Sequence, residues 1–183
     1  MVVFDTSVMG IAFDEHPSVP LDPATKLPLT HARARMDYLL KLLGESKQRV
    51  MLPTPAIAEY IVKGGPDKEK RVEAIVSSKA FVVAPFDLRA AIECALIEDA
   101  DTARGKPLAE SQTKAKVKFD RQIIAIAIAR GATTIYTGDR HLADVARSCE
   151  VNAVLTWELP LPPQEPQEPL DFGTESESVS PKH

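Results

Sequence analysis

Short apolar runs, separated by longer segments with helical spacing, make up the first 157 residues of the chain. The runs are VVF from residue 2, RVMLP from 49, AFVVAP from 80, ATTIYTGD from 132 and VNAVLTW from 151. They are too short for stable helices, and they lack the polar alternation of a strand with one face in water. They therefore predict five strands of a sheet that is covered on both faces.

The segments between the runs carry helix signals. THARARMDYLLKLLGES has an apolar stripe that ends at Gly44, and TPAIAEYIVKGG has Thr54 as an N-cap and Pro55 at the first helical position. Similar signals predict helices in PDKEKRVEAIVSS, FDLRAAIECALIEDADTARG, FDRQIIAIAIARG and RHLADVARS. Strands that alternate with helices predict parallel crossovers, so the fold class is α/β, with three layers and a mainly parallel sheet.

Composition divides the chain at residue 157. The segment from 158 to 183 is rich in Pro, Glu and Ser and has little apolar content. It cannot bury enough surface to offset its ordering entropy, so it predicts a disordered tail behind one folded domain, residues 1–157. The net charge of −4 lies in this tail, and the domain is nearly neutral. A neutral domain is compatible with nucleic-acid binding, which depends on local basic patches.

The sequence has no signal for a membrane or for secretion. No apolar run approaches the roughly 18 residues that cross a bilayer, and the N-terminal residues lack the basic and apolar regions of a secretory signal. Cys94 and Cys149 lie in unrelated segments without a metal-binding spacing. We therefore expect a cytoplasmic protein with reduced thiols and no membrane partner.

Four acidic residues stand where a parallel sheet gathers functional groups, beyond the carboxyl ends of its strands. Asp5 follows the first predicted strand, Asp139 follows the fourth, and Glu59 lies in the first turns of the helix after the second. Asp120 precedes the fourth strand, but AESQTKAKVKFDRQIIAIAIARG is helix-compatible throughout and places Asp120 on its apolar stripe. A long helix of this kind would carry Asp120 toward Asp5.

Carboxylates gathered at one place repel one another and raise each other's pKa values. A hard divalent cation removes this conflict, since Mg²⁺ and Mn²⁺ prefer carboxylate and water oxygens. One or two such ions could orient a water for attack on a phosphodiester. Each acid also has a simpler interpretation, as a helix cap, a turn residue or a surface residue.

The segments VVFDTSV, TPAIAEYI and KFDRQIIAIAIARGATTIYTGDRHL together resemble those of PIN-domain ribonucleases. The small single domain is similar to the VapC-type toxins of bacterial toxin–antitoxin pairs. The resemblance implies the sheet order 3-2-1-4-5, Mg²⁺- or Mn²⁺-dependent endoribonuclease activity on an RNA substrate, an antitoxin partner and a homodimer.

The same resemblance implies roles for individual residues. The catalytic and metal-binding residues would be Asp5, Glu59, Asp120 and Asp139. Supporting hydrogen bonds would come from Thr6, Ser7 and Thr137. His141 is a departure, because many relatives have a further acid at this position.

A basic stretch beside Asp120 predicts contacts with RNA. Its members are Lys114, Lys116, Lys118 and Arg121. They would position backbone phosphates, although a solvated helix face explains the same residues. Aromatic residues make up only 5% of the chain and form no series that could stack several bases, which favours recognition through phosphates and RNA shape.

Two other functions fit part of the pattern. A haloacid-dehalogenase-type phosphatase would also have a strand that ends in aspartate, but it needs a second acid two residues after Asp5, where the chain has Ser7. A catalytically inactive PIN-like module that binds RNA or protein is the non-enzymatic alternative. The presence of all four acids argues against it.

Overall fold

The structure, a computed structural model, describes residues 1–103 and 113–163, apart from the side chains of residues 101–103 and 114. Its centre is an all-parallel, five-stranded sheet in the order β3-β2-β1-β4-β5. The strands are β1 (Val2–Phe4), β2 (Val50–Pro53), β3 (Phe81–Ala84), β4 (Thr134–Thr137) and β5 (Asn152–Leu155). This sheet confirms the predicted fold class and strand order. The core includes Leu159, just past the predicted domain boundary, and most of the predicted tail (164–183) lies outside the described residues.

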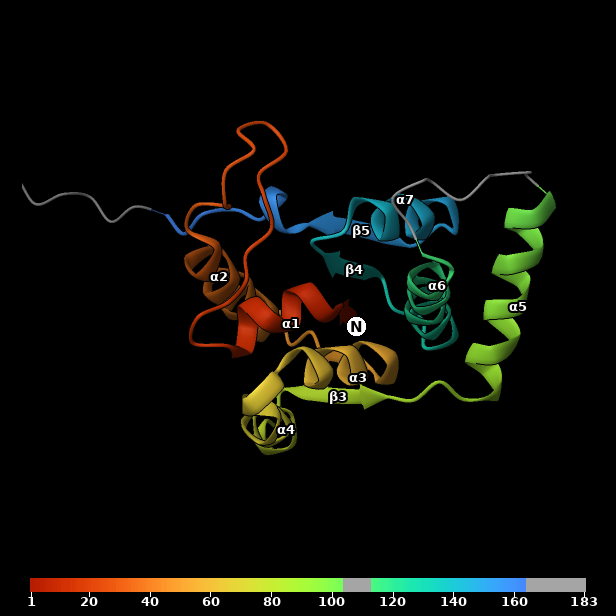
Figure 1. Ribbon diagram of the computed structural model, residues 1–183, viewed down its shortest axis with the longest axis horizontal. Coiled ribbons are helices and arrows are strands. Elements are labelled where there is room, and N and C mark those ends of the chain that lie inside the picture. The colour runs from red at the N-terminus through yellow and green to blue at the C-terminus, as the bar shows by residue number, and fades with distance from the viewer. Residues whose placement is uncertain (104–112, 164–183) are drawn as a thin grey trace, which may run out of the picture.

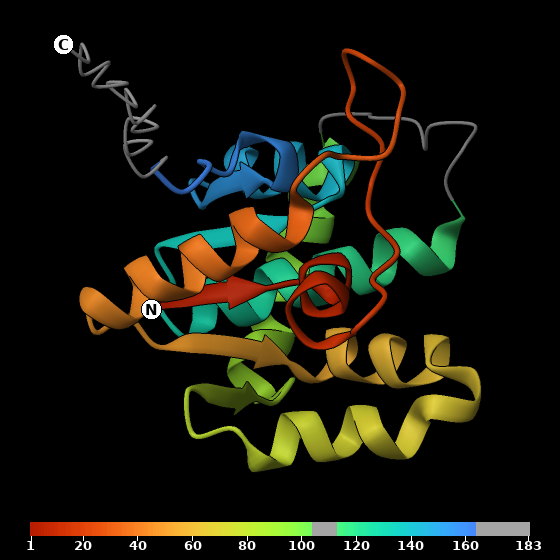
Figure 2. The same ribbon diagram turned by 90° about the vertical axis from the view of Figure 1, so that its left-hand side faces the viewer.

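Helices cover both sides of the sheet (Figure 1). α1 (Thr6–Phe13) and α2 (Ala32–Glu45) lie on one side, and α6 (Lys114–Ala129), packed against α5 (Leu88–Ala103), lies on the other, as Figure 2 also shows. The remaining elements are α3 (Thr54–Lys63), α4 (Lys68–Ser77), α7 (Arg140–Ser148) and the 3₁₀ turns η1 (Gly65–Asp67) and η2 (Thr156–Glu158). Among the described residues, no helix has the length and apolar character needed to cross a membrane.

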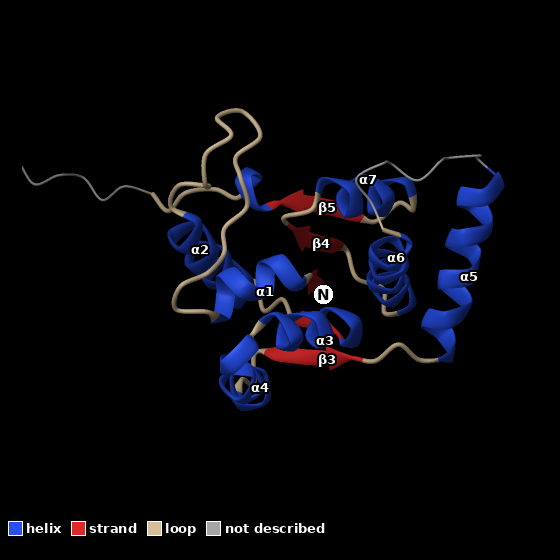
Figure 3. Cartoon of the chain, viewed as in Figure 1, coloured by secondary structure: helices blue, strands red, loops and turns tan. Residues whose placement is uncertain are grey.

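The hydrophobic pattern did not predict α1. This helix has only 8 residues and begins directly after Asp5. It lacks a polar face, because none of its residues is fully exposed, and so it has no amphipathic periodicity to reveal it. The loop from α1 to α2, the longest tan segment in Figure 3, folds back on itself through a single antiparallel bridge between Leu21 and Pro28.

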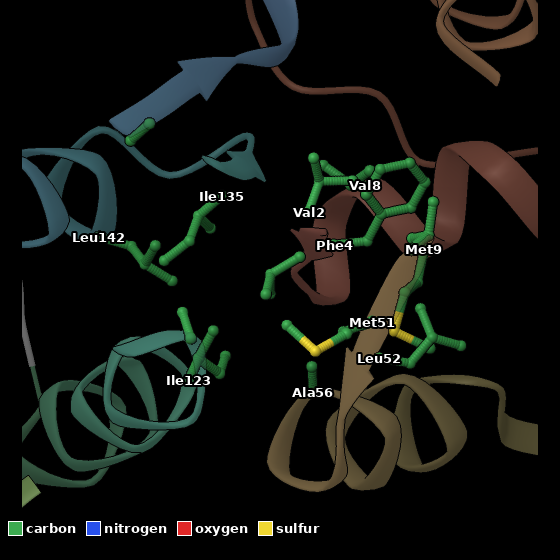
Figure 4. Packing of buried hydrophobic residues seen from close by; sticks show 14 of the residues in the cluster. Val2, Phe4, Val8, Met9, Met51, Leu52, Ala56, Ile123, Ile135 and Leu142 are labelled. Carbon is green, nitrogen blue, oxygen red and sulfur yellow. The ribbon is translucent and has the colours of Figure 1, made fainter. Parts of the chain in front are cut away.

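The core joins the sheet to the helices on its two sides (Figure 4). Val3 and Phe4 of β1, Leu52 of β2 and Ile135 of β4 are fully buried, and Ile124 of α6 belongs to the same cluster. Burial of the central strands on both faces explains their unbroken apolar sequences. Phe4 is paired with Tyr136, so β1 and β4 end side by side and their next residues share one edge of the sheet.

Candidate active site

The four acids that the sequence singled out line one cavity of about 830 Å³ at the carboxyl edge of the sheet. Asp5 follows β1, Asp139 follows β4, Glu59 comes from α3 and Asp120 from α6. Thr6, Ser7, Lys63, Lys116 and Gly138 also line this cavity. The structure therefore brings together, from four segments, the groups that the pattern placed at this edge.

Asp5 is a helix cap as well as a cavity residue. Its Oδ1 accepts hydrogen bonds from the backbone N–H of Val8 (2.9 Å) and the hydroxyl of Ser7 (2.7 Å). Its Oδ2 accepts one from the hydroxyl of Thr137. Burial raises the pKa of Asp5, and the three hydrogen bonds oppose that rise by stabilising the charged form. The cap explains why α1 begins here, and the bonds hold the carboxylate in one orientation.

Ser7 and Thr137 connect the ends of β1 and β4 around this carboxylate. The Ser7 hydroxyl accepts a hydrogen bond from the backbone N–H of Gly138 (2.7 Å), and the Thr137 hydroxyl accepts one from that of Asp139 (2.9 Å). A Cβ atom on Gly138 would lie only 2.9 Å from the Ser7 Oγ. The two hydroxyls thus hydrogen-bond both to Asp5 and to the backbone after β4, and glycine is needed for the close approach.

Glu59 is held by a neighbouring helix and by its own. Its Oε2 accepts a hydrogen bond from the Thr6 hydroxyl (2.7 Å), and its Oε1 lies 2.7 Å from the Lys63 Nζ. Burial acts to raise the pKa of Glu59, but the contacts with Lys63 and Thr6 outweigh it, so the pKa lies below its usual value. Lys63, which the sequence pattern did not single out, is one helical turn after Glu59, and its i,i+4 spacing is the feature by which the pair could have been predicted.

Of the four acids, Asp120 has the fewest contacts that would stabilise its negative charge. It is 7% exposed, and its Oδ2 is buried without a hydrogen-bond partner in the described part of the chain. Burial and the charges of Asp139, Asp5 and Glu59 raise the pKa of Asp120 to about 7, against the opposing charge of Lys116. Because α6 begins at Lys114, Asp120 lies inside the helix, and the interpretation of Asp120 as its N-cap is wrong.

The two carboxylate oxygens of Asp139 have different partners: one caps a helix, and the other pairs with a lysine of the cavity. Its Oδ1 caps α7 by accepting hydrogen bonds from the backbone N–H groups of His141 (2.8 Å) and Leu142 (3.4 Å). Its Oδ2 forms an ion pair with the Lys116 ammonium. Burial acts to raise the pKa of Asp139, but the Lys116 contact and the capping bonds together lower it. Lys116 therefore supplies the positive charge at this end of the acidic group.

The donor set suits a hard divalent cation, although the acids do not form a closed cage. Within the described residues, no three His, Cys, Asp or Glu side chains lie close enough together to hold a metal ion. Lysines occupy one oxygen each of Glu59 and Asp139, whereas Asp120 has a buried oxygen with no partner. Oxygen donors alone are what Mg²⁺ and Mn²⁺ prefer, so the fit to such an ion lies in the chemistry of these side chains and not in their present spacing.

The basic stretch that the sequence predicted is only partly at the site. Lys116 lines the cavity, whereas Lys118 is exposed outside it and Arg121 lies 3.6 Å from Glu98 of α5. The side chain of Lys114 lies outside the described part of the structure. Arg140, which directly follows Asp139, also lines the cavity, although it lies outside the predicted basic stretch.

The remaining wall of the cavity is largely apolar. It includes Pro20 and Leu21 from the loop before α2, Val62 of α3, Phe119 of α6 and Trp157 of η2. Neither ring stands out in the sequence, because the two residues are far apart in the chain and belong to no aromatic series. The packing of α6 and η2 around one cavity brings them together.

Comparison with known proteins establishes the fold. No family model matches the sequence, and the search of curated proteins gives no match. Among solved structures, VapBC2 from Rickettsia felis bound to a promoter DNA fragment is similar, with a TM-score of 0.58, 14% identity and coverage of 85% of this chain and 98% of that one. DNA-bound VapBC from Salmonella typhimurium has a TM-score of 0.56, 15% identity and coverage of 85% and 97%.

A third similar structure, FitAB bound to the IR36 DNA fragment, has a TM-score of 0.57, 22% identity and coverage of 87% of this chain and 98% of that one. The match extends over nearly the whole length of each of these chains. Identity is low in every case, so the likeness concerns the path of the chain and not its chemistry. The chain has the PIN-like fold that VapBC structures share.

Proposed function

We propose that the protein is a Mg²⁺- or Mn²⁺-dependent endoribonuclease whose catalytic and metal-binding residues are Asp5, Glu59, Asp120 and Asp139. The observation that carries the proposal is the buried, unpaired Oδ2 of Asp120 in a cavity that it shares with three other acids. Such a group costs stability, so the fold alone gives no reason for it. A divalent cation would provide its missing partner.

The residues that line the cavity would have separate roles in the reaction. A bound metal supplies a Lewis acid for the phosphate and a water of lowered pKa. Asp5, fixed by its three hydrogen bonds, would present a carboxylate that does not have to be oriented during the reaction. Lys63 and Lys116, which both line the cavity, would turn their ammonium groups from carboxylates to the oxygens of the RNA backbone.

The positive charge of α6 supports an approach path for RNA. Lys116 lines the cavity, and Lys118, further along the same helix, is exposed at the protein surface, where it would contact the RNA backbone. We include Lys114 and Arg121 in this path because they belong to the same basic stretch. These contacts with phosphates would raise the affinity for RNA without recognising its base sequence. Each of them should therefore add to the salt dependence of RNA binding.

A toxin role and an antitoxin partner are part of the proposal. They are supported by the motif resemblance and by the fold shared with VapBC complexes. An exposed apolar stripe on α5, formed by Leu88, Ile92 and Leu96, supports a homodimer, since a second copy would cover it. We place the protein in the cytoplasm and propose that the acidic tail from residue 158 is disordered. Light scattering of the purified protein tests the dimer.

Cleavage of RNA tests the central claim. A pool of single-stranded and structured RNA is incubated with the wild type, Asp5→Asn or Asp120→Asn in Mn²⁺, Mg²⁺ or EDTA. We expect metal-dependent cutting by the wild type and its loss in both variants. Asp144→Asn, a change of an exposed acid on α7, is the matched control and should cut normally.

A lack of cutting by the wild type, together with no rise of its melting temperature in Mn²⁺, would refute the proposal. The inactive binding module would then be the better description. Cutting that persists in Asp120→Asn would show that the unpaired oxygen has no part in the reaction, and the assignment of the site would fail.

A further inference from the structure

The cavity is lined by aromatic rings as well as by acids. Phe119 and Trp157 contribute rings to the same space that the four acids and Lys116 line. Phe119 is 44% exposed, although it directly precedes the buried Asp120. The core does not need an aromatic ring at this rim position, so Phe119 is available for a ligand.

Trp157 is paired with a cation that also faces the cavity. The Cζ atom of Arg140 lies 5.9 Å from the centre of the Trp157 ring, and both residues line the cavity. Arg140 is exposed and is the first residue of α7, directly after Asp139. A guanidinium held over an indole leaves N–H groups free to meet a phosphate and steadies the ring for stacking.

The order of these groups matches the chemistry of an unpaired RNA strand. Such a strand presents negative phosphates alternating with the flat faces of bases, and proteins bind it with cations and aromatic rings side by side. Here Lys63, Lys116 and Arg140 accompany the two rings in one cavity. In a duplex the base faces are covered by their neighbours, so the rings would have nothing to stack on.

We propose that Phe119 and Trp157 stack on bases that flank the phosphate presented to the acids, so that these two rings position the RNA strand in the site. This inference rests on the proposed nuclease function and adds two residues that contact the RNA. It also revises the sequence-based expectation that recognition uses phosphates and RNA shape without aromatic stacking. An apolar segment of a protein is the competing occupant, but it would offer no negative charge to Lys63, Lys116 and Arg140, which line the same cavity.

Fluorescence offers a direct test, because Trp157 is the single tryptophan of the chain. The Asp5→Asn protein with Mg²⁺ is titrated with a single-stranded RNA octamer, with the same octamer carrying two central abasic sugars, and with its duplex. We expect the single strand to quench the fluorescence and bind most tightly. Phe119→Ala should weaken its binding by about 5- to 100-fold, in line with the loss of one stacked base.

The variants separate stacking from other effects. Phe119→Tyr should bind like the parent, because it keeps a ring at this position. The loss caused by Phe119→Ala should disappear with the abasic octamer, since no base is present to stack. Val76→Ala, a change of an exposed apolar residue on α4 outside the cavity, should leave all three affinities unchanged.

Equal binding of the duplex and the single strand, or equal losses with normal and abasic octamers, would overturn the inference. Quenching by an apolar, basic peptide but not by RNA would also overturn it and would assign the rings to a protein partner. Wild-type cleavage is measured separately. Cutting without a stacking effect refutes only the stacking, and stacking without cutting refutes only the nuclease.

Discussion

Replacing Asp120 by asparagine should stabilise the metal-free protein, and the gain should increase with pH. The wild-type side chain has a buried oxygen without a partner and lies near three other acids, Asp5, Glu59 and Asp139. Asparagine has nearly the same shape and carries no charge. Its amide N–H groups can also donate to the neighbouring carboxylates, which the aspartate cannot do when ionised.

The size of the gain follows from the pKa of Asp120, which burial and the neighbouring acids raise from 3.8 to about 7. Between these two pKa values, the Asp120 carboxyl keeps its proton in the folded chain and loses it in the unfolded chain. A rising pH therefore favours unfolding. At about 1.36 kcal/mol per pH unit, the penalty is near zero below pH 4, about 1.5 kcal/mol at pH 5 and at most about 4 kcal/mol at pH 8. Water in the open cavity screens part of it, so we expect about 2–4 kcal/mol at pH 8.

Thermal unfolding in EDTA at pH 5 and pH 8 measures this difference. For a chain of this length, the expected gain at pH 8 corresponds to a rise in Tm of about 4–16 °C, with a smaller rise at pH 5. Asp144→Asn serves as the exposed control and should show no pH-dependent gain. A gain of the same size at both pH values would mean that the charge of Asp120 is not the source, and a loss at pH 8 would refute the reasoning.

Three further substitutions test other parts of the site and the fold. Lys116→Ala removes the ammonium paired with Asp139, so the Tm of the metal-free protein should fall. The rise in Tm on adding Mn²⁺ should be larger than in the wild type. Equal rises in Tm would contradict the idea that Lys116 takes the place of a metal cation. Gly138→Ala places a Cβ atom 2.9 Å from the Ser7 Oγ. This change should slow RNA cleavage by about 10- to 100-fold with little change in Tm. An unchanged cleavage rate would count against the supporting role of Ser7. Arg71 forms an ion pair with the largely buried Asp14 at 2.6 Å, and Asp14 also accepts a hydrogen bond from the Tyr60 hydroxyl. Arg71→Ala removes the cationic partner of Asp14, which should cost about 2–4 kcal/mol in urea unfolding while the folded enzyme still cuts; a stability equal to the wild type would contradict this.

The layout of the sheet and the positions of the acids were accessible from the sequence because both depend on local patterns. Each of the five apolar runs between helical segments forms a parallel strand, and Asp5 and Asp139 lie within two residues of the ends of β1 and β4. The helix around Asp120 was also predictable, since Ile123, Ile124 and Ala127 repeat at helical spacing. Helix α1 was not predicted because a short helix without a fully exposed face has no such periodicity.

The sequence by itself determined which residues stand at the edge of the sheet, whereas the tertiary structure decided which of them meet. The pairing of Lys116 with Asp139, the unpaired oxygen of Asp120 and the shared cavity of Phe119 and Trp157 all join segments that are distant in the chain. Local spacing sets the face of a helix or strand on which a side chain lies. The distance between two such faces depends on how the core packs, and no local pattern encodes it.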